Sequence, residues 1–327
     1  MNIQLIVQDS RTGTIYDISE AVMDVTWETQ LTGQAGKLSF NYVRQPDVTF
    51  SEGSVVRFTV NTQGVFYGYI FTQSESESSS VSVTAYDQLR YLKNKDTYVF
   101  SEKTETASTI FEKVCKDFNL SYRVVDSSTY RLTARVHDDK TLFEIIETGI
   151  DETLAFNAQW YMIRDNFGVL EFCELNRLKT NLVIGDASLL TGYTFESSID
   201  SDTYNQIKLS QENKDTQKRE VYIVRDSSTM KTWGTLQYTE KVDEDVNPSQ
   251  IEELANRLLR AKNRITKTLQ VTCIGDLRVS SGNGVVLSIA DLVDNGVANN
   301  EYYLVTSATH SFGNNEHTMT LELQVSV

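Results

Sequence analysis

Histidine and cysteine are the side chains here with the widest chemical range, and the chain holds three of each. His310 and His317 fall on neighbouring strands of one expected hairpin, where the two rings can approach each other, while His137 stands apart. A zinc site needs further ligands, and neither a cysteine nor an ordered set of carboxylates lies near this pair. We therefore expect ordinary strand or turn histidines and no metal site.

The three cysteines fit a buried, unreactive role. Cys115 falls on the apolar stripe of an expected helix, and Cys173 and Cys273 alternate with apolar residues of expected strands. Cysteine behaves as a small hydrophobic residue in such settings. Their odd number and wide separation give no disulfide framework, so we expect the chain to fold in a reducing cytoplasm.

Two acidic clusters are the remaining candidates for chemistry, because paired carboxylates can hydrolyse glycosidic bonds. Glu144, Glu147, Asp151 and Glu152 share one expected helix, where such a set most often forms a solvated face. Residues 243–245 come just before another expected helix, whose N-terminus interacts favourably with negative charge. The sequence therefore predicts no catalytic residue and no cofactor.

Length and composition describe a globular chain of about two or three domains. It has 327 residues, of which 40% are hydrophobic and 23% charged, so we expect a large core and no disorder. No apolar run approaches the ~18–20 residues that span a bilayer, and the N-terminus lacks the basic segment of a secretory signal. The formal net charge of −15 repels phosphate backbones and anionic lipids, so neither nucleic acid nor a membrane is an expected partner.

Hydrophobic periodicity changes along the chain. Alternating apolar and polar residues predict strands over most of the first ninety residues and again in the last quarter. Between them, residues 107–118 and 141–155 show helical spacing, and Thr104 or Thr106 is expected to cap the first of these helices. Asn247, followed by proline, predicts the start of a further helix.

These patterns give a fold class that is mainly β with α+β insertions. Residues 1–95 are expected to form a first β-domain, residues 96–180 an inserted α+β domain, and residues 181–327 a second β-domain. The second β-domain should contain an inserted segment at about 212–247 and a helix at about 248–264.

An internal repeat links the first and the last part of the chain. Residues 51–60 and 281–289 each read as a glycine-led turn into an alternating strand. Each is followed by an aromatic strand, a polar loop and a last alternating strand. The match is one of pattern and not of identity. It fits either a duplicated β-domain or the general likeness of antiparallel β-domains, and the sequence leaves both open.

Short segments spread over nearly the whole chain form a specific combination, although none is diagnostic alone. They include the run Ile-Gly-Asp-Leu-Arg-Val at 274–279. The others are residues 85–92, 140–143, 183–186, 198–205, 218–222, 226–228, 233–234, 282, 284–286, 303–305, 310–312 and 316–321. This combination resembles the XkdQ/YqbQ family. The departures from the family lie mainly in loops, for example at residues 295–300.

Members of that family look like baseplate hub proteins of contractile tails in phages, defective prophages and phage-tail-like bacteriocins, similar to the T4-type hub and the late-control D proteins. The resemblance implies two tube-type antiparallel β-barrel domains related by internal duplication, plus smaller inserted domains. It also implies a homotrimeric ring with pseudo-sixfold symmetry that adapts the hexameric tail tube to the trimeric central spike. Such a chain is made in the bacterial cytoplasm and assembled into the baseplate of the particle.

The implied partners are further copies of the chain, the tail tube protein and the central spike protein, with tape-measure and baseplate wedge proteins as additional candidates. We expect two equivalent polar loops, at 74–80 and 313–316, to lie at the same end of the ring and to contact neighbouring ring components. The residues expected to make these contacts are Ser74, Glu75, Ser76, Glu77, Gly313, Asn314, Asn315 and Glu316.

Two other functions stay open at this point. A cell-wall hydrolase acting on peptidoglycan at the tail tip would be favoured by a cleft with two carboxylates about 5–10 Å apart. A glycan-binding module would be favoured by exposed aromatic platforms, but the aromatic residues at 67–71 and 302–303 follow strand patterns that suit cores or subunit contacts. We therefore predict a structural protein and no enzyme.

Overall fold

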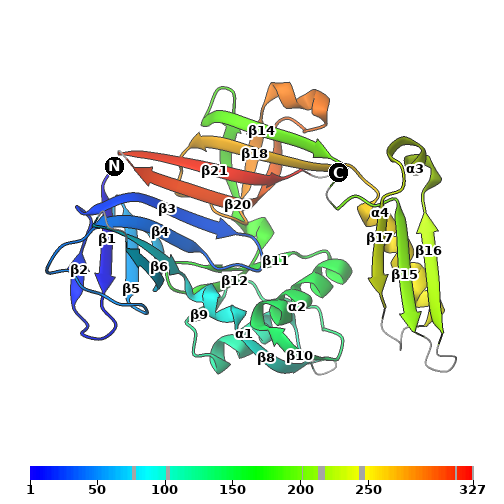
Figure 1. Ribbon diagram of the computed structural model, residues 1–327, viewed down its shortest axis with the longest axis horizontal. Helices are drawn as coiled ribbons and strands as arrows, with labels where there is room; N and C mark the ends of the chain where they lie inside the picture. The colour runs from blue at the N-terminus through cyan, green and yellow to red at the C-terminus, as the bar shows by residue number, and fades with distance from the viewer. Residues whose placement is uncertain are drawn as a thin grey trace. The chain divides into compact units, whose positions relative to one another are not determined.

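The computed structural model describes residues 1–75, 79–100, 104–200, 202–212, 218–242, 247–313 and 315–325. Over these residues the fold is mainly β, with one sheet of 13 strands and three smaller sheets (Figure 1). The strands of the large sheet are β1 (Ile3–Gln8), β2 (Ile15–Asp17), β3 (Val22–Gln30), β4 (Lys37–Val43), β5 (Val55–Val60), β6 (Gln63–Glu75), β7 (Ser80–Tyr86), β13 (Lys179–Gly185), β14 (Leu190–Ser198), β18 (Thr266–Ile274), β19 (Gly284–Ser288), β20 (Glu301–Gly313) and β21 (Glu316–Gln324). The expected fold class, mainly β with α+β insertions, is confirmed.

The large sheet joins the two β parts of the chain. Its strands lie in the order β14-β18-β21-β20-β3-β4-β7-β6-β5-β1-β2, and β19 connects β13 to β20. The expected closure into two barrels is not found, since no pairing within the described ranges joins β1 or β2 to β3 in the first β part, or β13 to β14 in the second. The two β parts instead share one sheet, because β3 of the first pairs with β20 of the second.

Alternation along the strands builds the core of this sheet. In β5, Val56, Phe58 and Val60 point inwards and are at most 2% exposed, while the residues between them are half-buried. Phe58 meets Phe312 of β20 edge-on, with ring centroids 5.1 Å apart. Burying a side chain of this kind stabilises the fold by roughly 1.5–3 kcal/mol, so this contact helps to hold the two β parts together.

An α+β segment with its own core lies between the two β parts in the sequence. Thr106 and Thr141 each begin a helix with a capping box, and the expected cap at Thr106 is confirmed. The apolar faces of the two helices meet around Ile110 and Ile146, which are fully buried. The elements are η1 (Gln88–Lys93), β8 (Lys95–Phe100), α1 (Ala107–Asp117), β9 (Tyr122–Val124), β10 (Arg135–Thr141), α2 (Leu142–Asn157), β11 (Tyr161–Asp165), β12 (Leu170–Glu174) and η2 (Leu175–Leu178), and a further 3₁₀ helix, η3 (Ala290–Asn295), follows β19.

The chain forms two compact units, of which the first consists of Met1–Tyr193 and Gln270–Gln324 and the second mainly of Thr194–Leu269. In the second unit a sheet with the order β16-β15-β17 packs its apolar face on α4. Asn247 caps α4 and Pro248 opens it, as the sequence predicts. The elements are β15 (Gln206–Glu212), β16 (Arg219–Arg225), α3 (Ser227–Trp233), β17 (Gln237–Lys241) and α4 (Pro248–Lys262). Among all the helices described, none is long and apolar enough to cross a membrane.

Candidate functional site: the junction of two equivalent strand sets

Six strands of the first β part and six of the second have the same arrangement. The first set is β1, β3, β4, β5, β6 and β7, and the second set is β13, β14, β18, β19, β20 and β21. Numbered along the chain within each set, the strands lie in the order 1-4-5-6-3-2 in both. The sets differ in one pairing, because β1 is antiparallel to β5 whereas β13 is parallel to β19. A shared order of six strands favours duplication over a general likeness of β-domains.

The turns that lead into the fourth strand of each set match in detail. Gly53 and Gly282 hold left-handed backbones, with φ of +80° and +87°. Their amides donate to the carbonyl oxygens of Ile70 (2.7 Å) and Val305 (2.8 Å). Ile70 and Val305 in turn each donate to the carbonyl of the residue that follows the glycine, at 2.9 Å in both sets. The glycine-led turns of the sequence repeat are therefore one structure that occurs twice.

The fifth strands of the two sets, β6 and β20, carry the same irregularity. Both are 13 residues long. The register of β6 on β7 shifts between Ile70 and Thr72, and that of β20 on β21 shifts between Val305 and Ser307. A bulge adds a residue to one strand and bends it. Because the turns make Ile70 equivalent to Val305, the two bulges occupy the same position, which a chance likeness of β-domains would not produce.

The second strands of the sets, β3 and β14, correspond as well. The amide of Val43 donates to the carbonyl of Ala21 (3.0 Å), and that of Ile274 donates to the carbonyl of Leu189 (2.9 Å). In each set the second strand begins at the next residue and runs for nine residues. The equivalence thus pairs the last residue of β3, Gln30, with the last residue of β14.

The two sets meet where β20 pairs with β3, from Ser307 opposite Gln30 to Phe312 opposite Val25. The Gln30 side-chain amide donates to the Ser307 hydroxyl (3.0 Å). Further along, the ring of His310 lies 5.0 Å from that of Trp27. Backbone hydrogen bonds, a side-chain hydrogen bond and a contact between two aromatic rings therefore join the fifth strand of one set to the second strand of the other.

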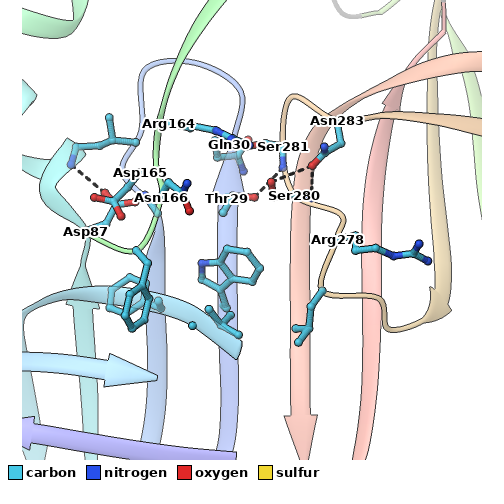
Figure 2. A pocket seen from close by; sticks show the side chains of 18 of the residues that line it. Thr29, Gln30, Asp87, Arg164, Asp165, Asn166, Arg278, Ser280, Ser281 and Asn283 are labelled. Atoms are coloured by element: carbon cyan, nitrogen blue, oxygen red, sulfur yellow. Dashed lines mark hydrogen bonds between the residues drawn. The ribbon is translucent and has the colours of Figure 1, made fainter. Parts of the chain in front are cut away.

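A pocket of about 180 Å³ opens at this junction. Figure 2 shows Asp87 and Asp165 on one side of it and Ser281 with Asn283 on the other. The amide of Ser281 donates to the Thr29 hydroxyl (2.9 Å), which fixes the far wall to β3. The pocket therefore lies where the first set, the second set and the turn after β11 come together.

Asp87 is buried and Asp165 is half-buried, and their carboxyl groups form a pair at this pocket. Asp87 accepts the amides of Gly36 (2.9 Å) and Leu89 (3.0 Å), while Asp165 accepts that of Gly168 (2.7 Å). Burial, and then the Asp165 charge, raise the pKa of Asp87 well above its usual range. Burial raises the pKa of Asp165 to about 6. The Oδ2 atom of Asp165 is buried and has no hydrogen-bond partner.

This carboxyl pair is built to hold backbone in place. Each oxygen of Asp87 accepts one backbone amide, one of them at the cap of η1, so Asp87 ties β4 and the start of η1 together. The sequence analysis missed the pair. Its only local signals are the short polar side chain of Asp87 before a helical turn and the hairpin turn that begins at Asp165.

The expected approach of His310 and His317 is confirmed, because Nδ1 of His310 lies 2.9 Å from Nε2 of His317. Nε2 of His310 lies 2.9 Å from the carbonyl oxygen of Val279, which can only accept, so Nε2 carries a hydrogen. In the neutral ring Nδ1 then accepts, and Nε2 of His317 donates. Burial, and then His317, lower the pKa of His310 to about 4. Within the described ranges, no three metal-ligating side chains of His, Cys, Asp or Glu are grouped to hold a metal ion.

The cysteines are core residues, as predicted. Cys115, Cys173 and Cys273 are at most 1% exposed. Burial raises the pKa of Cys115 and of Cys273 to about 12 and that of Cys173 to about 11. These thiols therefore stay protonated and unreactive at neutral pH.

The expected solvated face of α2 is wrong at Glu152. Glu152 is 8% exposed and accepts the amide of Thr133 (2.7 Å) while it pairs with Arg135. Glu147 accepts the amide of Gly33 (2.7 Å). Contacts with the segment around the start of β10 bury Glu152, and the contact with the turn after β3 leaves Glu147 half-buried; helical spacing alone does not reveal either contact. Residues 243–245 lie outside the described ranges.

Five of the expected contact residues lie within the described part of the chain. Ser74 and Glu75 end β6, Gly313 ends β20, and Asn315 and Glu316 begin the return along β21. The other three, Ser76, Glu77 and Asn314, fall outside the described residues.

The strand register places the two hairpin ends at the same end of the sheet. Phe312 lies opposite Val25 near the start of β3, whose first residue lies opposite Tyr42 near the end of β4. Val43 then lies opposite Ser80 at the start of β7, next to the end of β6. What these ends contact stays a prediction.

Comparison with known proteins agrees with this geometry. The chain is 29% identical over 286 residues to the phage-like element PBSX protein XkdQ of Bacillus subtilis (strain 168), which covers 86% of this chain and 85% of that protein. Its fold is similar to that of the prophage MuSo2 43 kDa tail protein from Shewanella oneidensis, with a TM-score of 0.71, 12% identity, and 99% and 98% of the two chains covered.

The fold is also similar to that of the E. coli c3393 protein, a type VI secretion system component described as structurally similar to the T4 tail proteins gp27 and gp5. That comparison has a TM-score of 0.54 and 10% identity and covers 94% of this chain and 74% of the other. The family model described as YQBQ-like matches residues 25–324. The chain therefore belongs to the YQBQ-like family.

Proposed function

We propose that the chain is a structural baseplate hub of a contractile tail and forms a homotrimeric ring with pseudo-sixfold symmetry. The observation that carries this proposal is the equivalence of the two strand sets. Three copies with two equivalent sets each present six similar surfaces to a hexameric ring, while their other parts present three identical surfaces to a threefold partner. One kind of chain can thus join the hexameric tail tube to the trimeric central spike.

The names of the related proteins support this assignment. XkdQ belongs to a phage-like element, and the Shewanella protein is a prophage tail protein. We infer that this chain is likewise made in the bacterial cytoplasm and assembled into the baseplate of a phage or phage-tail-like particle. Its partners there are two further copies of itself, the tail tube protein and the central spike protein, with tape-measure and wedge proteins as further contacts.

The charge distribution fits a ring through which acidic cargo passes. Residues 194–269 hold 13 acidic and 12 basic side chains, so the rest of the chain, which includes most of the two strand sets, holds nearly all of the net charge of −15. A surface of one sign repels a polyanion instead of binding it. This suits a passage for DNA that has to move without sticking.

The assembly state tests the proposal directly. We expect the full chain mixed with its spike protein to give the mass of a complex with three copies of each, by native mass spectrometry. Electron microscopy of tail tips should then show one ring of three chains between tube and spike. A chain that stays monomeric with the spike and is absent from the imaged tip would rule out the hub function.

We propose no catalytic role. The Asp87–Asp165 pair is the feature that most favours a hydrolase, but the backbone amides that Asp87 and Asp165 accept support a role in holding the turns around them. The purified chain should therefore leave peptidoglycan intact. Digestion that disappears in an Asp165→Asn variant would overturn this part of the proposal.

A further inference from the structure

The equivalence of the two sets leaves two strand edges without the neighbour that their counterparts have. In the second set, the C-terminal half of β20 pairs with β3, on the side of β20 that also holds β19. The counterpart of β20 is β6, which pairs on this side with β5 only up to Tyr69. Over the described residues no strand lies beside the rest of that edge, residues 71–75.

The counterpart of β3 is also free. β3 lies between β4 and β20, whereas β14 has β18 on one side and no strand described on the other, so it forms an edge of the sheet (Figure 1). A long strand edge with open amides and carbonyls tends to pair with another strand unless it is guarded by lysine, proline or a cover. β14 carries one charged residue, Glu196, and no proline.

We propose that β14 of one copy pairs antiparallel with the C-terminal half of β6 of the next copy, and so repeats between chains the β3–β20 junction that exists within each chain. This inference rests on the proposed homotrimer and adds its interface. Within one chain, the fifth strand of the second set (β20) pairs with the second strand of the first set (β3). Between chains, the fifth strand of the first set (β6) pairs with the second strand of the second set (β14). One type of contact then occurs six times around a ring of three chains.

The register follows from the equivalences. Ser307 lies opposite Gln30 in the junction within the chain. Ser307 corresponds to Thr72, because each follows its bulge, and Gln30 corresponds to Ser198, because each ends its nine-residue strand. Thr72 of one copy therefore faces Ser198 of the next. Continuing along the strands, Ser74 faces Glu196.

The hydrogen-bond alternation also carries over. Leu31 donates to the carbonyl of Thr306, so the next pair, Gln30 and Ser307, is a non-hydrogen-bonded pair. Thr72–Ser198 and Ser74–Glu196 then become non-hydrogen-bonded pairs, in which side chains come closest. Gln73–Ser197 and Glu75–Phe195 become the pairs whose amides and carbonyls bond across the interface.

The side chains suit this register. Ser74 and Glu196 are exposed in the single chain, and a hydroxyl can donate to the carboxylate that it faces. Glu75 and Glu196 fall on opposite faces of the ladder, since they belong to successive pairs, so the two charges are kept apart. No like charges therefore meet directly across the proposed contact.

A disulfide trap tests the register in full-length protein. In tail particles assembled from the Ser74→Cys/Glu196→Cys variant, mild oxidation should link neighbouring copies into covalent dimers and trimers on a non-reducing gel, because non-hydrogen-bonded pairs have Cα atoms about 4.5 Å apart. The matched control is Ser74→Cys/Ser197→Cys, in which a one-residue shift turns the second thiol to the other face of the sheet. The three native cysteines are buried and add no background.

The outcomes separate the interface from the function. Cross-linking of the 74/196 pair at least tenfold above the 74/197 pair supports the proposal. Particles that contain the trimer but link neither pair, or both pairs equally, overturn the register while the hub function stands. Particles without a trimer overturn the hub function itself.

Hydrogen exchange of the unmodified chain gives a second readout that needs no variant. The amides of Gln73, Glu75, Phe195 and Ser197 should exchange at least tenfold more slowly in the assembled particle than in the free monomer. Unchanged exchange at these four positions in a trimer would overturn the proposed pairing.

Discussion

Gly53 and Gly282 hold the same left-handed turn in the two strand sets, but only Gly282 faces a buried side chain. A Cβ on Gly282 would fall on the sulfur of Met162, whereas a Cβ on Gly53 would meet nothing closer than Ser10, at 3.8 Å. Met162 is 3% exposed and has little room to move. The two glycines therefore share a backbone requirement and differ in packing.

This difference gives a matched pair of substitutions. Gly53→Ala should lower the free energy of unfolding by about 1–2 kcal/mol, the cost of a left-handed backbone with a Cβ. Gly282→Ala should lower it by the same amount plus about 1–3 kcal/mol for overpacking against Met162. Urea denaturation of both variants measures the two values. Equal losses of unfolding free energy would show that the Met162 side chain moves aside at no cost. An unchanged unfolding free energy in Gly53→Ala would contradict the left-handed turn.

The features that depend on short-range sequence patterns could be predicted from the sequence. The mainly β class, the caps at Thr106 and Asn247, and the paired glycine turns all follow from local spacing and residue type. The junction of Trp27 with His310 could not be predicted, because a contact between strands from opposite ends of the chain depends on how two domains dock. The burial of Asp165 escaped prediction for the same reason.

Asp165 should destabilise the fold as its carboxyl ionises. Its pKa is raised to about 6 in the folded chain, compared with 3.8 for a free side chain, so the folded state binds the proton more tightly. The stability that protonation confers is present at low pH and is lost as the pH rises through 6. A shift of this size corresponds to roughly 3 kcal/mol at most.

Asp165→Asn should therefore raise the free energy of unfolding by about 1–3 kcal/mol at pH 8 and change it little at pH 4. The amide oxygen of asparagine can still accept the Gly168 amide, so the turn is kept. Denaturant unfolding at the two pH values measures the effect. An equal gain at both would contradict an ionisation effect, and a loss at pH 8 would show that the charge is stabilised by a partner.

His310 should act in the opposite direction over nearly the same range. Its pKa is lowered to about 4 in the folded chain from 6.5, so the unfolded state binds the proton more tightly. The stability that the neutral ring confers is present above pH 6.5 and is lost as the pH falls towards 4, by roughly 3 kcal/mol at most. Around pH 4–6 this loss offsets the gain from protonation of Asp165.

Single variants should expose the two opposing effects. Between pH 6.5 and pH 4, the Asp165→Asn variant should lose more stability than the parent chain, and the His310→Phe variant should lose less. At pH 7 the His310→Phe variant should be less stable than the parent, because the Val279 carbonyl loses its hydrogen-bond donor. Unfolding free energies at half-unit pH steps give both slopes. Parallel curves for the parent and both variants would contradict the two pKa shifts.

Glu316 offers a test of the hairpin ends as contacts with neighbouring ring components. It is exposed at the start of β21, while Glu322 is exposed near the other end of the same strand. If the end that carries Glu316, Gly313 and Glu75 meets another ring, Glu316→Lys should weaken the binding of the hub to that component by about tenfold, or 1.4 kcal/mol.

Glu322→Lys makes the same charge change away from that end and should leave binding as it is. Both should stay within about 0.5 kcal/mol of the parent in unfolding free energy, as surface substitutions usually do. Binding of each variant to the isolated tube and spike proteins, measured by calorimetry, identifies which ring this end meets, and equal binding by both variants to both rings would show that the hairpin ends are not contact sites.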